Sequence, residues 1–198
     1  MAGAASTALP LRESFWRKTI ELAARWYVFV FLNIYGTGKI HGGQFYRHGH
    51  LPPDVAHTTL GEAGPFELAW TFMGYSFAYI LFIGLAEVVG AWLLLWEKTK
   101  LLGVAILLPV MVNILVFDVI FLDQYGALAS ATIYTTLLFV ILAFNAERVR
   151  QAFQALTAQS GQKTPRVRAK LVFATLALIG IVFALDQILV NLFGHGKG

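Results

Sequence analysis

Long uninterrupted runs of apolar residues constrain this chain more than any other feature of its sequence. A helix needs roughly 20 apolar residues to cross the hydrocarbon core of a bilayer. Five such runs occur, near residues 18–36, 68–96, 100–122, 126–146 and 170–193. The runs are continuous and do not alternate between polar and apolar residues, so they favour helices over the strands of a membrane barrel. The sequence therefore predicts an all-α membrane protein.

The arrangement of these runs predicts a four-helix transmembrane bundle followed by a fifth, C-terminal transmembrane helix. Residues 1–17 are expected to form a cytoplasmic N-terminal segment, and residues 18–146 the bundle. The bundle includes a loop over residues 37–66 that is rich in glycine and proline, which favour turns. Residues 147–169 are expected to form an amphipathic helix on the inner surface and a polar linker. The fifth helix and a tail occupy residues 170–198.

The distribution of basic residues predicts the orientation of the chain. If the N-terminus is cytoplasmic, eleven lysine and arginine residues lie on the inner side, against Lys39, Arg47 and Lys197 on the outer side. Loops that stay in the cytoplasm carry such an excess of basic residues. We therefore expect a protein of the cell's inner membrane, with the C-terminus and the loop 37–66 outside. The bias also accounts for the basic pI of about 9.4 without nucleic acid as a partner.

The residue types that are absent exclude several kinds of chemistry. The chain has no cysteine, which excludes disulfides, thiol redox chemistry and cysteine-ligated metal or iron–sulfur centres. The sequence shows no haem or flavin motif either. Any redox function would therefore need a partner that supplies or accepts the electrons.

Charged residues within the apolar runs are the first candidates for a functional site, because charges at membrane depth are costly and usually paired. Counted from the inner side, Arg25 and Glu87 have compatible depths, so we expect an ion pair between them, with Asn113 as a possible third partner. This pair could fix helix register, bind a ligand or handle protons. Asp118 and Asp186 are predicted near the outer surface, where water would solvate them or where they would face Lys39 and Arg47.

The loop that follows the first apolar run is the second candidate site. Its histidines His41, His48, His50 and His57 could in principle hold a metal ion, but their spacing matches no specific metal-binding motif. We therefore predict no metal site. Lys39 and Gln44 instead place a cation and an amide where the helix leaves the membrane, beside glycines that allow close approach. That composition suits a quinone carbonyl or a lipid phosphate, and equally an ordinary helix exit.

Three segments carry a resemblance to a known family. The first run ends in "NIYGTGKIHGGQF", the second contains "FIGLAEVVGAWLLLWEKTKLLG", and the third reads "AILLPVMVNILVFDVIF". Together they resemble the DoxX-like family of small membrane proteins. The matching positions are Gly36, Lys39, Gly84, Glu87 and Gly90. The resemblance implies a four-helix bundle and, for some members, quinone-linked oxidoreduction; other members are accessory subunits. The long loop, the amphipathic segment and the fifth helix depart from that pattern.

Three functions therefore stay open at the level of the sequence. The first is a subunit or accessory protein of a redox-linked or respiratory membrane complex, partnered by other membrane subunits or by further copies of itself. The second is a quinone-interacting oxidoreductase of the DoxX-like type, with a head-group site formed by Arg25, Lys39, Gln44, Glu87 and Asn113. The third is a proton-coupled carrier of small solutes that uses Glu87, although the sequence shows no inverted repeat to support it.

Overall fold

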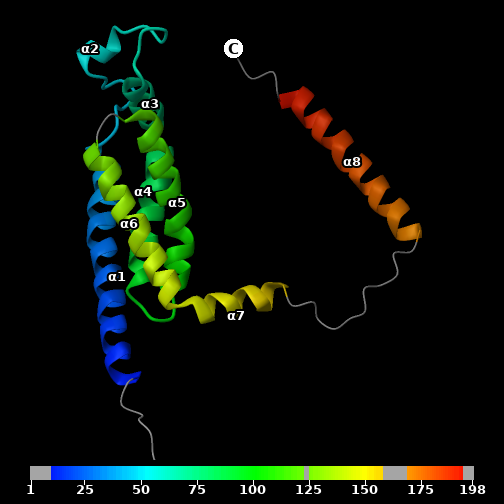
Figure 1. Cartoon of the computed structure of the whole chain (residues 1–198). Helices are drawn as coiled ribbons and strands as arrows, with labels where there is room; N and C mark the ends of the chain where they lie inside the picture. Colours follow the sequence, from blue (N-terminus) through cyan, green and yellow to red (C-terminus); the bar gives the residue numbers. More distant parts are fainter. Residues whose placement is uncertain (1–9, 123–124, 158–168, 194–198) are drawn as a thin grey trace, which may run out of the picture. The chain divides into compact units, whose positions relative to one another are not determined.

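The computed structural model describes residues 10–122, 125–157 and 169–193, and every regular element in these ranges is a helix (Figure 1). The helices are α1 (Pro10–His41), α2 (Pro53–Ala56), α3 (Pro65–Gly74), α4 (Phe77–Leu94), α5 (Lys100–Phe121), α6 (Tyr125–Phe144), α7 (Ala146–Thr157) and α8 (Ala169–Phe193). The chain forms two units, Met1–Phe153 and Gln154–Gly198. The first unit contains the helix bundle.

Four long helices form that bundle. α1 packs against α4 and α6, and α5 packs against α4 and α6, so the four helices close into a ring (Figure 1). The short helix α3 packs against α4 and α5. Inside the ring lie apolar side chains with almost no solvent exposure, among them Val28, Leu32, Leu94, Leu107 and Leu138. Van der Waals packing of these side chains against one another holds the helices together.

The prediction of an all-α membrane protein is confirmed. Among the described helices, α4, α5, α6 and α8 are long and apolar enough to cross a membrane. α1 has the length but carries Glu21, Arg25 and Lys39, and its glycines and tyrosines lower its hydropathy further. The membrane crossing of residues 18–36 therefore stays a prediction, supported by the packing of α1 along α4 and α6.

Two boundaries differ from those expected. α1 does not end at its first glycines but continues to His41, because Gly36 lies in a close helix contact instead of a turn. The run 68–96 was predicted to be one helix and is two, since the chain breaks between Gly74 and Phe77 and Ser76 is extended. At the break, a Cβ atom on Gly74 would lie 1.8 Å from the carbonyl oxygen of Tyr46. The loop therefore packs directly on the end of α3.

The segment after the bundle contains α7, in the range for which an amphipathic helix was predicted. The residues Val149, Phe153 and Leu156 recur at helical spacing on α7 and are exposed, while Glu147 and Arg150 pair with each other. Residues 1–9, the linker at 158–168 and the tail from 194 lie outside the described residues. α8 is a single apolar helix.

Candidate functional site

A buried ion pair between Lys39 and Glu87 forms the centre of the candidate site. Lys39 Nζ donates hydrogen bonds to both carboxylate oxygens of Glu87, at 2.6 and 2.7 Å. The Lys39 side chain is 6% exposed and the Glu87 side chain is fully buried. Because the ammonium group meets both oxygens, the bridge is bidentate at the carboxylate and each charge is neutralised inside the bundle.

Two glycines explain how α1 and α4 bring this pair together. Gly36 and Gly84 each precede a member of the pair by three residues, so they lie on the same helix face, about one turn away. A Cβ atom on Gly36 would lie 2.9 Å from the carbonyl oxygen of Gly84, which is tighter than real Cβ contacts allow. The missing side chains let the two backbones touch. This contact sets the depth at which Lys39 meets Glu87.

A first cavity of about 460 Å³ opens beside the pair, between α1, α5 and α6. Its size falls within the range of pockets that hold small ligands. Polar groups line one part of it and apolar side chains, such as Leu32, Met111 and Ile114, line the rest. The polar lining consists of Tyr35, Lys39, Gln44, Glu87, Asp118, Ser130 and Tyr134.

A second cavity, of about 380 Å³, lies between α3, α4 and α5. Its walls are mainly apolar and include Met73, Phe82 and Pro109. The two cavities share Lys39, Gln44, Trp70, Ile114 and Asp118. One polar centre is therefore reached from two sides of the bundle.

The charges at this centre do not balance within the described residues. Asp118 on α5 is 5% exposed and lines both cavities with Lys39, yet no described cation lies within ion-pair distance of it. With both carboxylates ionised, Lys39 would face two negative charges. The prediction that water solvates Asp118 at the outer surface is wrong, because α5 packs this side chain into the bundle. The alternative, that Asp118 faces Lys39, agrees with the shared cavities.

The predicted Arg25–Glu87 pair is wrong. Arg25 is buried midway along α1, at the level where α4 ends, and there it donates to the carbonyl oxygens of Leu94 and Leu95 and pairs with Glu97. Leu94 lies seven residues beyond Glu87 on α4, about 10 Å along the helix axis. Arg25 therefore satisfies the last carbonyl groups of α4, which have no partner within the helix. Depth counted from the sequence placed Arg25 too near the middle of the bundle.

Of the remaining predicted residues, Gln44 lies at this centre, Asn113 lines one of its two cavities, and Asp186 belongs to the other unit of the chain. Gln44 lies with Lys39 in both cavities. Asn113 lines the second cavity but is exposed and makes no hydrogen bond to Arg25 or Glu87 within the described structure. Asp186 lies on α8, in the other unit of the chain, where Gln187 donates a hydrogen bond to it.

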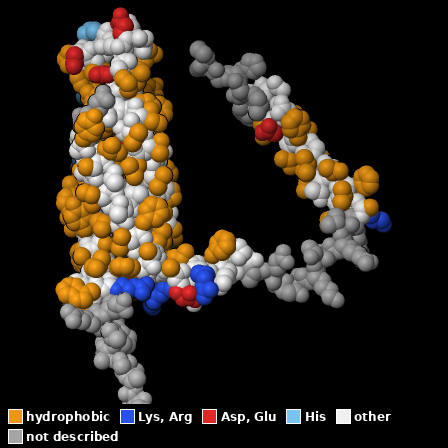
Figure 2. Space-filling view, in the orientation of Figure 1, with side chains coloured by type: hydrophobic (Ala, Val, Ile, Leu, Met, Phe, Trp, Pro, Cys, Tyr) orange, Lys and Arg blue, Asp and Glu red, His pale blue; other side chains and the backbone are white. Residues whose placement is uncertain are grey.

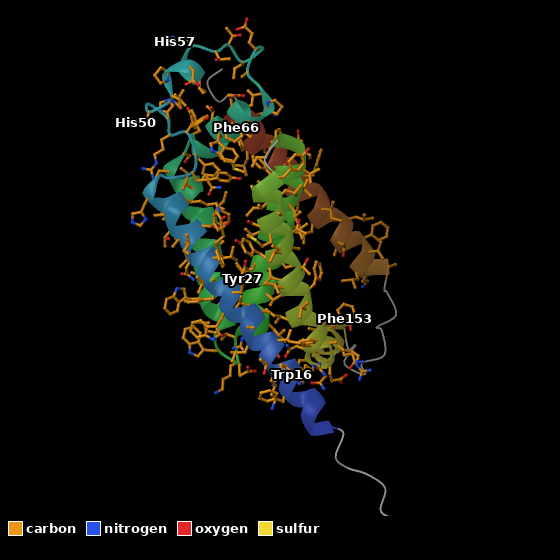
Figure 3. The ribbon with its side chains drawn as sticks, turned by 60° about the vertical axis from the view of Figure 1, so that its left-hand side comes forward. Trp16, Tyr27, His50, His57, Phe66 and Phe153 are labelled. Carbon is orange, nitrogen blue, oxygen red and sulfur yellow. The ribbon has the colours of Figure 1, made fainter. Side chains whose placement is uncertain are left out.

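The loop histidines lie apart from this centre. Figure 3 shows His50 and His57 in the loop beyond the end of α1, and both are exposed. The Nδ1 atom of His41 lies 2.8 Å from the carbonyl oxygen of Thr37, and the ring of His48 packs edge-on against Tyr75. In the part of the chain that the structure describes, no three histidine, aspartate or glutamate residues come together as a metal site.

Three residues at this centre were not included in the site predicted from the sequence. Asp118 was noted but placed at the surface, and Trp70 and Tyr134 resemble ordinary membrane aromatics in the sequence. A helical projection of α6 puts Tyr134 on the same face as the small residues Ala127, Ser130 and Ala131, and that pattern is a signal of a packed face.

Comparison with known proteins finds a relative that is similar to this chain in sequence. The chain is 35% identical over 126 residues to a protein of Bacillus subtilis (strain 168) described as "Uncharacterized protein YwoB". The alignment covers 64% of this chain and 77% of that protein. No family model matches the chain, and no solved structure matches it.

Proposed function

This chain belongs to the family of the Bacillus subtilis protein YwoB, and we propose that it is an integral membrane subunit of a redox-linked complex that binds a quinone-type head group inside its helix bundle. The observation that carries this proposal is the Lys39–Glu87 pair, which lies with Asp118 between two cavities. The resemblance of Gly36, Lys39, Gly84 and Glu87 to the DoxX-like pattern supports it further.

The residues around the centre fit the chemistry of a quinone. A quinone ring is flat and apolar, with carbonyl oxygens at opposite edges that accept hydrogen bonds. Lys39, Gln44 and Tyr134 supply donors, and Trp70 supplies an aromatic surface in both cavities. The apolar walls suit a hydrocarbon tail. Ligand pockets of this kind combine mostly apolar walls with a few placed polar groups.

The residues of the chain have separate roles in this proposal. A bound quinone would accept two electrons and two protons, and the electrons would come from a partner subunit. Lys39 donates a hydrogen bond to a carbonyl oxygen and holds the head group. Glu87 and Asp118 hold protons beside it, which matches their burial with one lysine.

Organic extraction of the purified protein tests the proposal. We expect a quinone in the extract of the wild-type protein, identified by mass spectrometry, and at least a tenfold lower content in Lys39→Gln. The matched control is Lys100→Gln, because Lys100 pairs with Glu21 at 2.5 Å, is equally buried, and lines neither cavity. An extract free of quinone in the wild type, or equal losses in both variants, would contradict the proposal.

A proton-coupled carrier is the second candidate, and the double opening of the polar centre favours it. Two cavities that share Lys39 and Asp118 offer a solute access from two sides. Uptake into proteoliposomes that depends on a proton gradient and is lost in Glu87→Gln would support a carrier. Uptake that does not depend on the proton gradient would contradict a proton-coupled carrier.

The orientation and the assembly are part of the same proposal. We place the N-terminus in the cytoplasm and the site toward the outer side of the inner membrane, because basic residues are concentrated at the other end of the bundle. Purification in a mild detergent, followed by mass spectrometry of the native material, tests the complex. Redox subunits that purify with the chain would support it, whereas a lone monomer would not.

A further inference from the structure

One end of the bundle carries a cluster of cations that the proposed quinone site does not use. We call this the basic end: it comprises the start of α1, the turn between α4 and α5, and the junction of α6 with α7 (Figure 2). Hydrogen bonds from Arg17 to the carbonyl oxygen of Phe144, and from Asn145 and Lys100 to Glu21, join these segments. The basic end is therefore one continuous surface.

The charges of the basic end do not cancel. Its described cations are Arg17, Lys18, Arg25, Lys98, Lys100, Arg148 and Arg150, against the carboxylates Glu21, Glu97 and Glu147. The buried Arg25 pairs with Glu97, and the buried Lys100 pairs with both Glu21 and Glu97. Arg150 pairs with Glu147. Four exposed cations outnumber the carboxylates that could pair with them. They are Arg17, Lys18, Lys98 and Arg148. One of the four, Arg148, lies 4.0 Å from Glu97, which already pairs with two buried cations.

The position of these cations in the fold identifies the layer in which they lie. Lys98 lies in the five-residue turn between α4 and α5, two helices long and apolar enough to cross the membrane. Such a turn ends at the level of the lipid headgroups. Exposed aromatic rings lie beside it, including Trp16 and Trp96, and rings of this kind concentrate at membrane interfaces.

α7 adds an apolar face at the same end. Figure 3 shows Trp16 and Phe153 at the same end of the bundle. Val149 and Phe153 recur one turn apart and are exposed, while Arg148 and Arg150 flank Val149. A helix with an apolar face and basic residues lies in the plane of the membrane surface, where anionic lipids attract it.

We propose that the basic end binds the phosphate groups of anionic phospholipids, with Lys98 and Arg148 as its main contacts and α7 lying in the headgroup layer. An arginine guanidinium meets a phosphate with two parallel hydrogen bonds, and a lysine meets it as a point charge. The opposite end of the bundle carries Asp54, Glu62 and Glu67 (Figure 2). The recognition is therefore confined to one leaflet.

Native mass spectrometry of the purified full chain tests this inference. The detergent-solubilised protein is mixed with equal amounts of phosphatidylglycerol and phosphatidylcholine that have the same acyl chains, and the lipids retained are counted. We expect the wild-type protein to retain phosphatidylglycerol several-fold more than phosphatidylcholine. A basic residue near an anionic surface contributes about fivefold in affinity, so the loss of both charges in Lys98→Gln with Arg148→Gln should abolish this several-fold preference.

The matched control keeps both charges. Lys98→Arg with Arg148→Lys should retain the preference for phosphatidylglycerol, which separates charge from any local misfolding. In the wild-type protein the preference should also fall as the salt concentration rises from about 0.05 to 0.5 M, because salt screens exposed charges. Equal retention of the two lipids by the wild type, or an unchanged preference in the glutamine variant, would overturn the inference. An acidic protein that occupies this surface, with no lipid preference, would overturn it too.

Discussion

Removing one partner of the Lys39–Glu87 pair should destabilise the bundle far more than removing both. The pair is bridged at 2.6 and 2.7 Å, and neither side chain is more than 6% exposed. Glu87→Met leaves the buried Lys39 ammonium group without an ion-paired carboxylate, because Asp118 lines the same cavities but lies beyond ion-pair distance, and Lys39→Met leaves a buried carboxylate. Breaking a buried pair in this way costs about 3–5 kcal/mol. The double variant replaces both charges with side chains of similar volume, which is often neutral or stabilising.

The test is a double-mutant cycle on the free energy of unfolding. Unfolding is monitored by circular dichroism in mixed detergent micelles. We expect each single variant to lose about 3 kcal/mol or more and the double variant to lie close to the wild type, which requires a strongly favourable coupling. The exposed Arg150–Glu147 pair on α7 is the control and should show no measurable coupling. Additive losses, or single losses as small as those of an exposed pair, would refute the reasoning.

Two further predictions follow from contacts away from the pair. Gly74→Ala places a Cβ atom 1.8 Å from the carbonyl oxygen of Tyr46, so it should displace the loop and lower the melting temperature. The control is Gly61→Ala, whose Cβ atom meets nothing within 4 Å and should leave the melting temperature unchanged. Equal melting temperatures of the two variants would contradict the packing of the loop on α3. Hydrogen bonding from Lys100 lowers the pKa of Glu97 below its usual value of 4.5. The stability that Glu97 contributes is therefore present above about pH 4.5 and is lost as the pH falls through the lowered pKa. Glu97→Gln should weaken this acid-induced loss in thermal unfolding measured from about pH 6 to 3, and identical pH profiles would contradict the assignment.

The helical membrane fold was predictable because apolar run length and continuity depend on the local sequence alone. The break between α3 and α4 was not, because it depends on Tyr46 packing onto Gly74 from a segment far away in the chain. Likewise, glycines that suggest a turn in the sequence can instead mark close helix contacts. Gly36 is such a case, and its contact with Gly84 lets α1 continue through Lys39.

The composition of the candidate site was predicted in part. Lys39 and Gln44 were selected for their polarity at the membrane boundary and Glu87 for its charge within an apolar run, and the structure brings the three together. Arg25 was assigned to the wrong partner, because a long side chain can reach the helix end and its carbonyl groups. For Asp118 the sequence left solvation by water and contact with Lys39 both open, because the distance of a residue from the end of an apolar run does not reveal the direction in which α5 turns it. Which residues pair with each other depends on how the helices rotate and pack, and this cannot be determined from the local sequence around each residue.

The most direct test of the central claim is photoaffinity labelling of the membrane-embedded wild-type protein with an azido-quinone, followed by mapping of the labelled peptides. The account predicts that the label attaches to residues lining the two cavities, in the segments around Lys39, Trp70, Asp118 and Tyr134, and that excess unmodified quinone suppresses it. It also predicts that Lys39→Gln lowers the labelling strongly while Lys100→Gln does not. Labelling spread over lipid-facing residues, unaffected by competing quinone or by Lys39→Gln, would contradict a head-group site in this bundle.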